Sequence, residues 1–171
     1  MKTLDAAIIH KAADSLARRM LSPYAKTPPE ELVFERGPHG KPFLPGFPGL
    51  HFNISHSGCY IACAVAPVPV GIDVQMIALP KNDVAGRYFT TREQQYIAQG
   101  DNFALRFCRV WTMKESYLKR TGQGLSIPLD SFDVLEQPQG LFREIMLDGA
   151  ICQICCDPAT NPQFEIETFY R

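Results

Sequence analysis

The chain has 171 residues, 46% of them hydrophobic and 20% charged, which is typical of compact folded domains rather than disordered chains. Its 17 Lys and Arg residues against 18 Asp and Glu residues give a formal net charge of −1, which excludes a globally basic surface for nucleic acid or an anionic membrane. The longest apolar stretch, residues 61–72, contains two prolines and is shorter than the roughly 20 residues of a membrane span. We therefore expect neither a nucleic-acid partner nor a membrane partner.

Charged residues interrupt the apolar N-terminus, which lacks the continuous apolar core of a secretory signal. We expect a cytoplasmic protein whose six cysteines are reduced thiols. Cys152 and Cys155 form a Cys-x-x-Cys pair, but no second pair and no spaced His pair accompanies it. This spacing favours small core residues over a zinc site.

Apolar periodicity predicts three helices and several short strands. A helix is expected over residues 4–21, ended by Pro23. Thr91 followed by Gln94 fits a capping box that begins a helix to about residue 98, and a longer helix over 102–120 should stop at Gly122. Strands are expected at 32–35, 51–54, 60–65, 70–74, 132–135, 141–147, 151–156 and 164–169. The grouping of helices and strands indicates an α+β fold with mainly antiparallel sheets packed with helices.

The segment Phe52-Asn53-Ile54-Ser55-His56-Ser57-Gly58 leads a half-apolar strand into polar, flexible residues. A strand end rich in hydroxyl and imidazole groups and followed by glycine suits an anion that the backbone approaches closely. The same residue types also form ordinary turns, so both interpretations stay open at this point.

Asp73 is the one acid in an apolar strand, and Gln75 projects from the same strand face. A buried lone carboxylate is costly unless it is paired or binds a metal. Mg²⁺ accepts one or two protein carboxylates and fills its other positions with water and phosphate oxygens. A salt bridge would satisfy Asp73 equally well.

Trp111, Glu115 and Lys119 are spaced by four and share one face of the predicted helix, with Lys114 on a neighbouring edge. A Glu-to-Lys pair at this spacing is also a common helix-stabilising feature. The position of the pair, after a tryptophan and before a Gly-x-Gly turn, gains meaning only together with the two segments above.

Taken in chain order, four segments resemble the Sfp-type 4′-phosphopantetheinyl transferases. They are Gly40-Lys41-Pro42-Phe43-Leu44, residues 52–58, Val70-Gly71-Ile72-Asp73-Val74 and residues 111–119. The resemblance spans about residues 40–134. It implies a holo-[acyl-carrier-protein] synthase, which transfers the 4′-phosphopantetheine arm of coenzyme A to a serine hydroxyl of an apo acyl or peptidyl carrier protein. Adenosine 3′,5′-bisphosphate is released, and the reaction depends on Mg²⁺.

The resemblance also implies roles for matching residues. Asp73, Glu115 and Lys119 are expected to be catalytic, and the serine proton is expected to pass to Glu115 or to a metal-bound water. The expected metal ligands are Asp73, Glu115 and Gln75. Lys119 should contact the pyrophosphate, and His56 the 3′-phosphate. The residues expected to bind coenzyme A are Gly40, Lys41 and Pro42 against the adenine, and Ser55, His56, Lys114 and Lys119 against the phosphates.

The family's fold implies two similar halves related by pseudo-twofold symmetry, with the active site in the cleft between them. We place the halves at residues 1–79 and 80–171, so Asp73 comes from the first half and Glu115 and Lys119 come from the second. The carrier protein is expected to dock near residues 85–96, on a monomer. The pathway, whether fatty acid, polyketide or nonribosomal peptide biosynthesis, is left open.

Two features depart from the family's pattern. Many relatives have an acid where this chain has Gln75, so we expect weaker metal binding rather than loss of activity. Longer relatives also carry an N-terminal strand with basic residues that bind the 3′-phosphate. Here His10, Lys11, Arg18 and Arg19 are expected to form the solvated face of the first helix.

Two alternative functions use the same residues. A degenerate relative would bind coenzyme A or a carrier protein without efficient transfer, and replacing Glu115 or Lys119 would then abolish no activity. A Mg²⁺-dependent hydrolase of nucleotide pyrophosphates would explain neither the helix of Trp111 nor the loop at residues 40–42.

Overall fold

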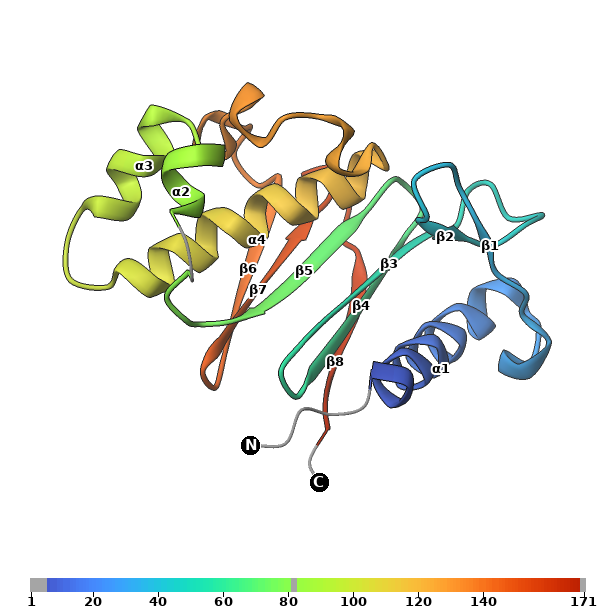
Figure 1. The fold of residues 1–171 in the computed structure, drawn as a ribbon. Helices are drawn as coiled ribbons and strands as arrows, with labels where there is room; N and C mark the ends of the chain where they lie inside the picture. Colours follow the sequence, from blue (N-terminus) through green and yellow to red (C-terminus); the bar gives the residue numbers. More distant parts are fainter. Residues whose placement is uncertain (1–5, 81–82, 170–171) are drawn as a thin grey trace.

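The computed structural model describes residues 6–80 and 83–169 and has the predicted α+β architecture (Figure 1). Two antiparallel sheets of three strands each form its centre, with strand orders β3-β4-β8 and β5-β7-β6, and a small β1-β2 ribbon lies apart from them. The strands are β1 (Glu35–Arg36), β2 (Pro42–Phe43), β3 (His51–Ser57), β4 (Tyr60–Ala66), β5 (Gly71–Met76), β6 (Phe142–Leu147), β7 (Ala150–Cys155) and β8 (Gln163–Thr168). The helices are α1 (Ala6–Ala25), α2 (Val84–Tyr88), α3 (Thr91–Ala98) and α4 (Phe103–Thr121), with 3₁₀ turns η1 (Pro29–Glu31), η2 (Gly124–Ser126), η3 (Leu129–Ser131) and η4 (Val134–Glu136).

The sheets do not follow the order of the chain. β5 pairs with β7, and β8 pairs with β4, both antiparallel. A division of the chain at residue 79 therefore separates strands that share a sheet, because each of the two predicted halves contributes one strand to the sheet of the other.

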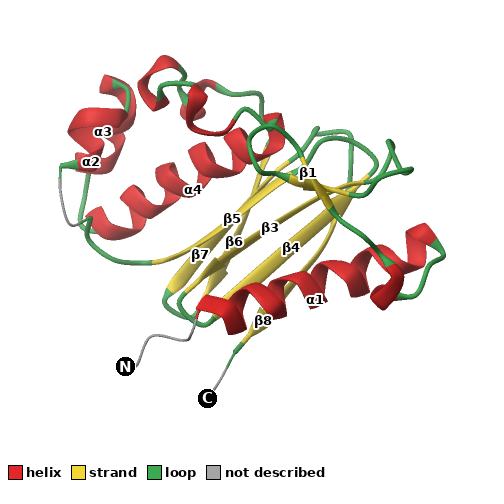
Figure 2. Cartoon of the chain, turned by 45° about the vertical axis from the view of Figure 1, so that its right-hand side comes forward, coloured by secondary structure: helices red, strands yellow, loops and turns green. Residues whose placement is uncertain are grey.

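Each sheet is covered by one long helix, as Figure 2 shows for α1 on β3 and β4 and for α4 on β5 and β7. Strand alternation explains why both faces of β4 are buried. Ile61, Cys63 and Val65 join the cluster beneath α1, whereas Ala62 and Ala64 join a second cluster with residues of β5 and β7. The two sheets thus share an apolar core on the side away from the helices.

The two sheets meet along a seam between β3 and β5 that side chains hold together. Main-chain N–H groups of β5 donate to alternate side chains of β3, which project toward β5 at every second residue. The bonds run from Ile72 N to Asn53 Oδ1 (2.8 Å), from Val74 N to Ser55 Oγ (3.2 Å) and from Met76 N to Ser57 Oγ (3.0 Å). The polar residues of the segment 52–58 therefore satisfy donors that a neighbouring strand would otherwise satisfy.

Four predictions were wrong in detail: the end of α1, the capping box of α3 and two of the strands. α1 continues through Pro23 to Ala25, because buried Leu21 and Ala25 hold its last turn against the sheet. The capping box of α3 consists of Thr90 and Glu93 rather than Thr91 and Gln94.

The expected strand at 132–135 is not a strand, and its second half belongs to the turn η4. Of the expected strand at 32–35, only Glu35 lies in a strand, β1. The carboxylate of Glu93 accepts the N–H of Val134, and Asp133 accepts that of Leu135. Side-chain carboxylates thus accept the backbone N–H groups that would otherwise pair with a neighbouring strand.

The six thiols are unpaired, and all except that of Cys59 are buried. Cys63, Cys108 and Cys152 belong to the apolar clusters, which confirms their interpretation as small core residues. Among the helices within residues 6–80 and 83–169, none is long and apolar enough to cross a membrane.

Candidate active site at the seam of the two sheets

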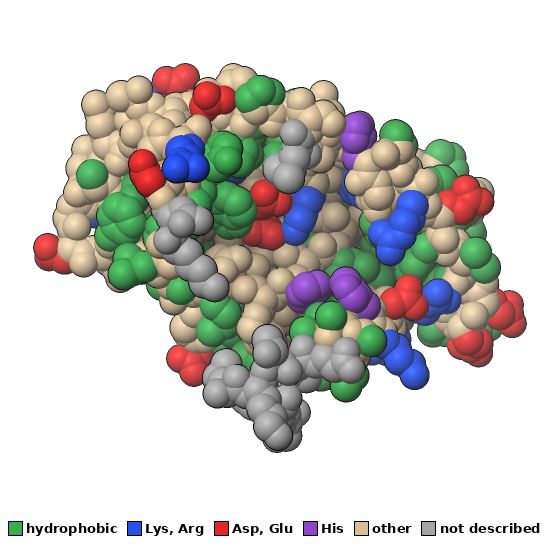
Figure 3. Space-filling model, viewed as in Figure 1, with side chains coloured by type: hydrophobic (Ala, Val, Ile, Leu, Met, Phe, Trp, Pro, Cys, Tyr) green, Lys and Arg blue, Asp and Glu red, His purple; other side chains and the backbone are tan. Residues whose placement is uncertain are grey.

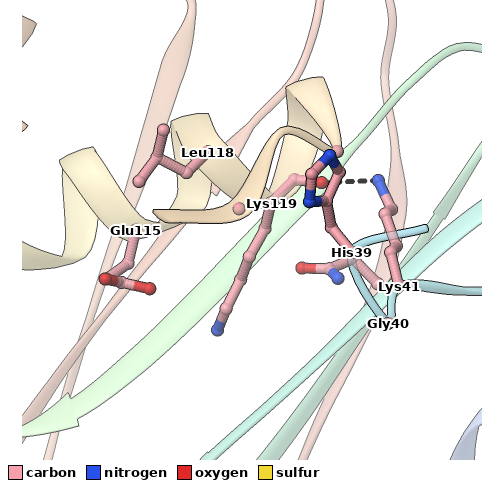
Figure 4. Close-up of a pocket in the computed structure, with 9 residues that line it drawn as sticks. His39, Gly40, Lys41, Glu115, Leu118 and Lys119 are labelled. Carbon is pink, nitrogen blue, oxygen red and sulfur yellow. Dashed lines mark hydrogen bonds between the residues drawn. The ribbon is translucent and has the colours of Figure 1, made fainter. Parts of the chain in front are cut away.

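Two adjoining cavities lie on the helix side of the seam. One, of about 320 Å³, is lined by Ile54, Ser55, His56, Asp73, Val74, Gln75, Trp111, Glu115 and Lys119. The other, of about 230 Å³, shares Glu115 and Lys119 and is completed by His39, Gly40, Lys41, Asn53, Leu118, Gly122 and Gly124. In Figure 3, acidic, basic and histidine side chains gather around a hollow in the middle of this face. Figure 4 shows Glu115 and Lys119 extending from the same side of α4, opposite the loop of His39 and Lys41.

An ion pair joins β5 to α4 at the centre of the site. Nζ of Lys119 lies 2.6 Å from Oδ1 of Asp73, and the same oxygen accepts the hydroxyl of Ser55 at 2.8 Å. Lys119 also donates to Ser55 Oγ at 3.1 Å. The Asp73 side chain is only 8% exposed, whereas that of Lys119 is 27% exposed, so the lysine remains the accessible partner. The salt bridge considered for Asp73 is present, and it lies within the cavity.

Burial raises the pKa of Asp73 above its ordinary 3.8, and Lys119 and the Ser55 hydrogen bond oppose part of that rise. Glu115, one helical turn before Lys119, is half-buried in the same cavity. Burial, and then the nearby negative charge of Asp73, raise the pKa of Glu115. The two carboxylates therefore lie close enough to repel each other, with one ammonium group between α4 and β5 to offset them.

The donor set fits a divalent cation held by two carboxylates. Among the residues that the structure describes, Oδ2 of Asp73 has no hydrogen-bond partner, and no group of three or more His, Cys, Asp or Glu side chains converges as metal ligands would. Mg²⁺ needs only one or two protein carboxylates beside phosphate oxygens and water. Gln75 lines the same cavity as Asp73, as the spacing of the two residues predicted, and offers an uncharged amide oxygen.

The loop of the Gly-Lys-Pro segment closes the second cavity beside the C-terminus of α4. Gly40 has φ +78°, a left-handed conformation that glycine adopts without strain. Lys41 donates to the carbonyl oxygens of Val70 (3.0 Å) and Lys119 (2.6 Å), which fixes the loop to α4. Burial and the charge of Arg120 lower the pKa of Lys41 to about 8. The ammonium of Lys41 thus has a structural task in addition to the expected nucleotide contact.

His56 lies at the edge of the site, between the seam cavity and a cavity of about 630 Å³ beneath α1. Its ring contacts that of His10 edge-on, with 5.5 Å between the ring centres. Pro42 and Arg36 line the same cavity. His10 is exposed, as expected for the solvated face of the helix, and the packing of α1 on β3 also brings its ring to His56.

Other basic residues of α1 have structural partners. Arg18 donates to Asp14 and to the carbonyl oxygens of Pro29 and Leu32, and Arg19 pairs with Glu167. His39 is a further residue that the sequence did not single out, and it enters the site because its loop faces α4. Its position directly before the Gly-Lys-Pro segment is the sequence feature that could have identified it as a site residue.

Lys114 is not brought into this group. Its side chain is fully buried on the opposite side of α4, 2.9 Å from Glu93 Oε2, and it donates to the carbonyl oxygens of Leu129 and Phe132. Adjacent residues of a helix project about 100° apart, so Glu115 and Lys114 face different surroundings. The geometry gives Lys114 an internal ion pair in place of the expected phosphate contact.

The fold and the cavity define an α+β protein in which two carboxylates, a lysine and a histidine line one cavity at the seam of two antiparallel sheets. Comparison with known families shows the class to which the chain belongs. The model of the 4′-phosphopantetheinyl transferase superfamily matches residues 69–164, and that of the 4′-phosphopantetheinyl transferase N-terminal region matches residues 7–68. The chain belongs to the 4′-phosphopantetheinyl transferase superfamily.

Individual relatives agree with this assignment. A 4′-phosphopantetheinyl transferase of Bacillus subtilis is 40% identical over 123 residues, which cover 71% of this chain and 55% of the relative. The gsp 4′-phosphopantetheinyl transferase of Aneurinibacillus migulanus is 32% identical over 158 residues, or 82% of this chain and 65% of the relative. An L-aminoadipate-semialdehyde dehydrogenase-phosphopantetheinyl transferase of Xenopus laevis is 32% identical over 72% of this chain and 46% of the relative. The chain spans about half the length of the curated relatives it matches.

Proposed function

We propose that the chain transfers the 4′-phosphopantetheine arm of coenzyme A to a serine hydroxyl of an apo acyl or peptidyl carrier protein. The observation that supports this function is the convergence of Asp73, Glu115 and Lys119 on one cavity at the seam. The family supports it as well, since relatives matching most of this chain are named phosphopantetheinyl transferases.

In the proposed reaction, the serine oxygen bonds to the phosphorus that carries the pantetheine arm. The bond between that phosphorus and the bridging oxygen of the pyrophosphate breaks, and its electron pair leaves with adenosine 3′,5′-bisphosphate. The serine proton passes to Glu115, the second carboxylate lining the cavity. Lys119 is suited to stabilise the charge that develops on the leaving phosphate, because its ammonium is already fixed by Asp73 and Ser55.

The nucleotide end of coenzyme A fits the cavity beneath α1. His56 and His10 offer imidazole groups for the 3′-phosphate, and Pro42 lines the same cavity for the adenine. Gly40 and Lys41 line the cavity that also contains Lys119, next to the proposed nucleotide site.

Asp73 and Glu115 are the residues that would hold Mg²⁺, with Gln75 beside them. When bound, the cation would neutralise charge on the pyrophosphate and on both carboxylates.

The carrier protein is proposed to dock on α2 and the start of α3. Tyr88 is 49% exposed there, and the exposed Arg87 in the last turn of α2 offers a positive charge to an acidic partner. We also propose a cytoplasmic location, with which the free thiols are compatible. The proposed protein acts as a monomer.

The test is a loading assay with coenzyme A, Mg²⁺ and a panel of purified apo carrier proteins, read as intact mass. We expect one phosphopantetheine to be added by the wild-type chain and by Lys26→Met, an exposed control outside both seam cavities. Lys119→Met and Glu115→Gln should lose loading by at least about 100-fold, the order of magnitude for removing one preorganised electrostatic group.

Calorimetry with coenzyme A completes the test. Binding without loading of any carrier would support the binding-only relative instead, and release of free phosphopantetheine without carrier would support the hydrolase. Equal loading by wild type and Lys119→Met would reject the proposed site.

A further inference from the structure

A second ion pair lies inside the protein, on the side of α4 that faces away from the cavity. Glu93 on α3 and Lys114 on α4 are 2.9 Å apart, and both side chains have 0% exposure. Burying two charges costs more than packing apolar side chains of similar size, so a pair of this kind is weak evidence for stability. The presence of the Glu93–Lys114 pair therefore needs an explanation other than stability.

Each member of the pair is fully occupied. Glu93 accepts the N–H of Thr90 (2.9 Å) through one oxygen and the N–H of Val134 (2.9 Å) through the other. Lys114 donates to the carbonyl oxygens of Leu129 (2.6 Å) and Phe132 (2.7 Å). Its ammonium also lies 4.3 Å from the centre of the Phe132 ring.

These contacts join three parts of the chain at one point. They tie the N-terminus of α3, the middle of α4 and the segment 129–134 to each other. Charged hydrogen bonds fix direction as well as distance, which apolar packing does not. The pair therefore defines the rotation of α4 about its own axis.

Rotation matters because the next residue of the helix is Glu115. Successive side chains project about 100° apart, so a fixed Lys114 directs Glu115, and Lys119 a turn later, toward the seam. On the far side, β5 meets α4 so closely that a Cβ at Gly71 would lie 1.9 Å from the carbonyl oxygen of Ser116. α4 is held between that contact and the ion pair.

We infer that the Glu93–Lys114 pair is a positioning device, which sets α4 so that Glu115 and Lys119 face the cavity at the distances the chemistry needs. The inference rests on the proposed function for its kinetic consequence. The proposed nucleotide contacts from His56 and His10 come from β3 and α1 rather than from α4. Loss of the pair should thus lower kcat while leaving the KM for coenzyme A nearly unchanged.

The chain offers a matched control. Arg19 of α1 and Glu167 of β8 form a partly exposed ion pair in another part of the molecule. Neither residue lines the cavity. The variant R19M/E167Q removes one basic and one acidic side chain without touching the anchor of α4.

The decisive variant is E93Q/K114M, which removes both charges so that neither remains buried alone. We expect it to fold with a lower urea midpoint, because the glutamine oxygen can replace only one of the two carboxylate acceptors and the carbonyl groups of Leu129 and Phe132 lose their donor. We also expect kcat to fall by about tenfold or more, since a displacement of ~1 Å can cost on the order of 100-fold. The KM for coenzyme A should stay within about twofold, because ground-state binding is untouched. R19M/E167Q should keep both constants.

Trp111 provides a readout that does not depend on transfer. It is the only tryptophan of the chain and lies on α4, one turn before Glu115, against Phe107. Its emission maximum should shift in E93Q/K114M and stay unchanged in R19M/E167Q. If the wild-type chain loads no carrier, the proposed function fails, and the emission shift still decides whether the pair sets α4.

A milder variant covers the case in which E93Q/K114M does not fold. Phe132→Leu removes the ring beneath the Lys114 ammonium and the stacking on Tyr117 while the ion pair remains. We expect a smaller loss of kcat, again with an unchanged KM. Wild-type kcat and emission in a folded E93Q/K114M, or in Phe132→Leu, would overturn the inference.

Discussion

The hydroxyl of Ser55 donates to Oδ1 of Asp73 at 2.8 Å and accepts the N–H of Val74 at 3.2 Å, so one side chain of β3 fixes both an acid and the backbone beside it. The same hydroxyl lies 3.1 Å from Lys119 Nζ. Ser55 thus belongs both to the seam between the sheets and to the candidate site. The stability of the seam is therefore linked to the geometry of Asp73 and Lys119.

Ser55→Ala should destabilise the protein by about 1–3 kcal/mol, because the buried N–H of Val74 and an oxygen of Asp73 lose their partner. Urea unfolding followed by circular dichroism would measure the change. Ser15→Ala on the exposed face of α1 is the control and should change little. A Ser55→Ala protein as stable as wild type would contradict the role of the hydroxyl in the seam.

Gly71→Ala should separate α4 from β5. The added Cβ would meet backbone on α4, 1.9 Å from Ser116 O and 2.5 Å from Arg120 N, and neither atom can rotate away. We expect a loss of about 1–3 kcal/mol in unfolding free energy and loss of carrier loading.

The control for Gly71→Ala is Gly49→Ala, where a Cβ has nothing within 4 Å. It should leave both stability and loading unchanged. Equal unfolding midpoints for the two variants would show that the close approach of β5 to α4 is not required.

Gln75→Glu should strengthen binding of Mg²⁺, since a third carboxylate would then line the cavity of Asp73 and Glu115. About 1.4 kcal/mol of added attraction would lower the magnesium concentration for half-maximal loading on the order of tenfold. Magnesium titrations by calorimetry and by loading rate would measure it. Gln95→Glu on the exposed side of α3 adds the same charge elsewhere, and an equal effect there would reject a local cation site.

The affinity for the 3′-phosphate should fall as pH rises. Burial, then the charges of His10 and Lys119, lower the pKa of His56 below its ordinary 6.5, so the imidazolium exists only in the acidic range and is lost before neutral pH. The preference for coenzyme A over 3′-dephospho-coenzyme A, measured by calorimetry, should therefore shrink with rising pH.

His10→Gln tests the sign of this dependence. It removes one positive neighbour, which should raise the pKa of His56 and move the loss of preference to higher pH. In the double variant His10→Gln/His56→Gln, which lacks both imidazoles proposed for the 3′-phosphate, the preference should not vary with pH across this range. A shift to lower pH in His10→Gln would mean that the two rings do not interact as charges.

The sequence by itself determined the elements and the residue types of the site. The spacing of Asp73 and Gln75 placed both on one strand face, and that of Glu115 and Lys119 placed both on one helix face. These predictions depend on local periods of two and 3.6 residues, which side chains obey whatever the rest of the chain does. The segment 52–58 and the Gly-Lys-Pro loop were likewise visible as departures from core packing.

Only the tertiary structure decided which of these residues meet. Lys114 shares a motif with Glu115 but turns away to Glu93, and His10 comes to His56 from a helix whose pattern marked it as solvated. The pairing of β5 with β7 and of β8 with β4 crosses the expected division at residue 79. Contacts between distant segments follow from which apolar faces are buried together, and a local pattern does not contain that information.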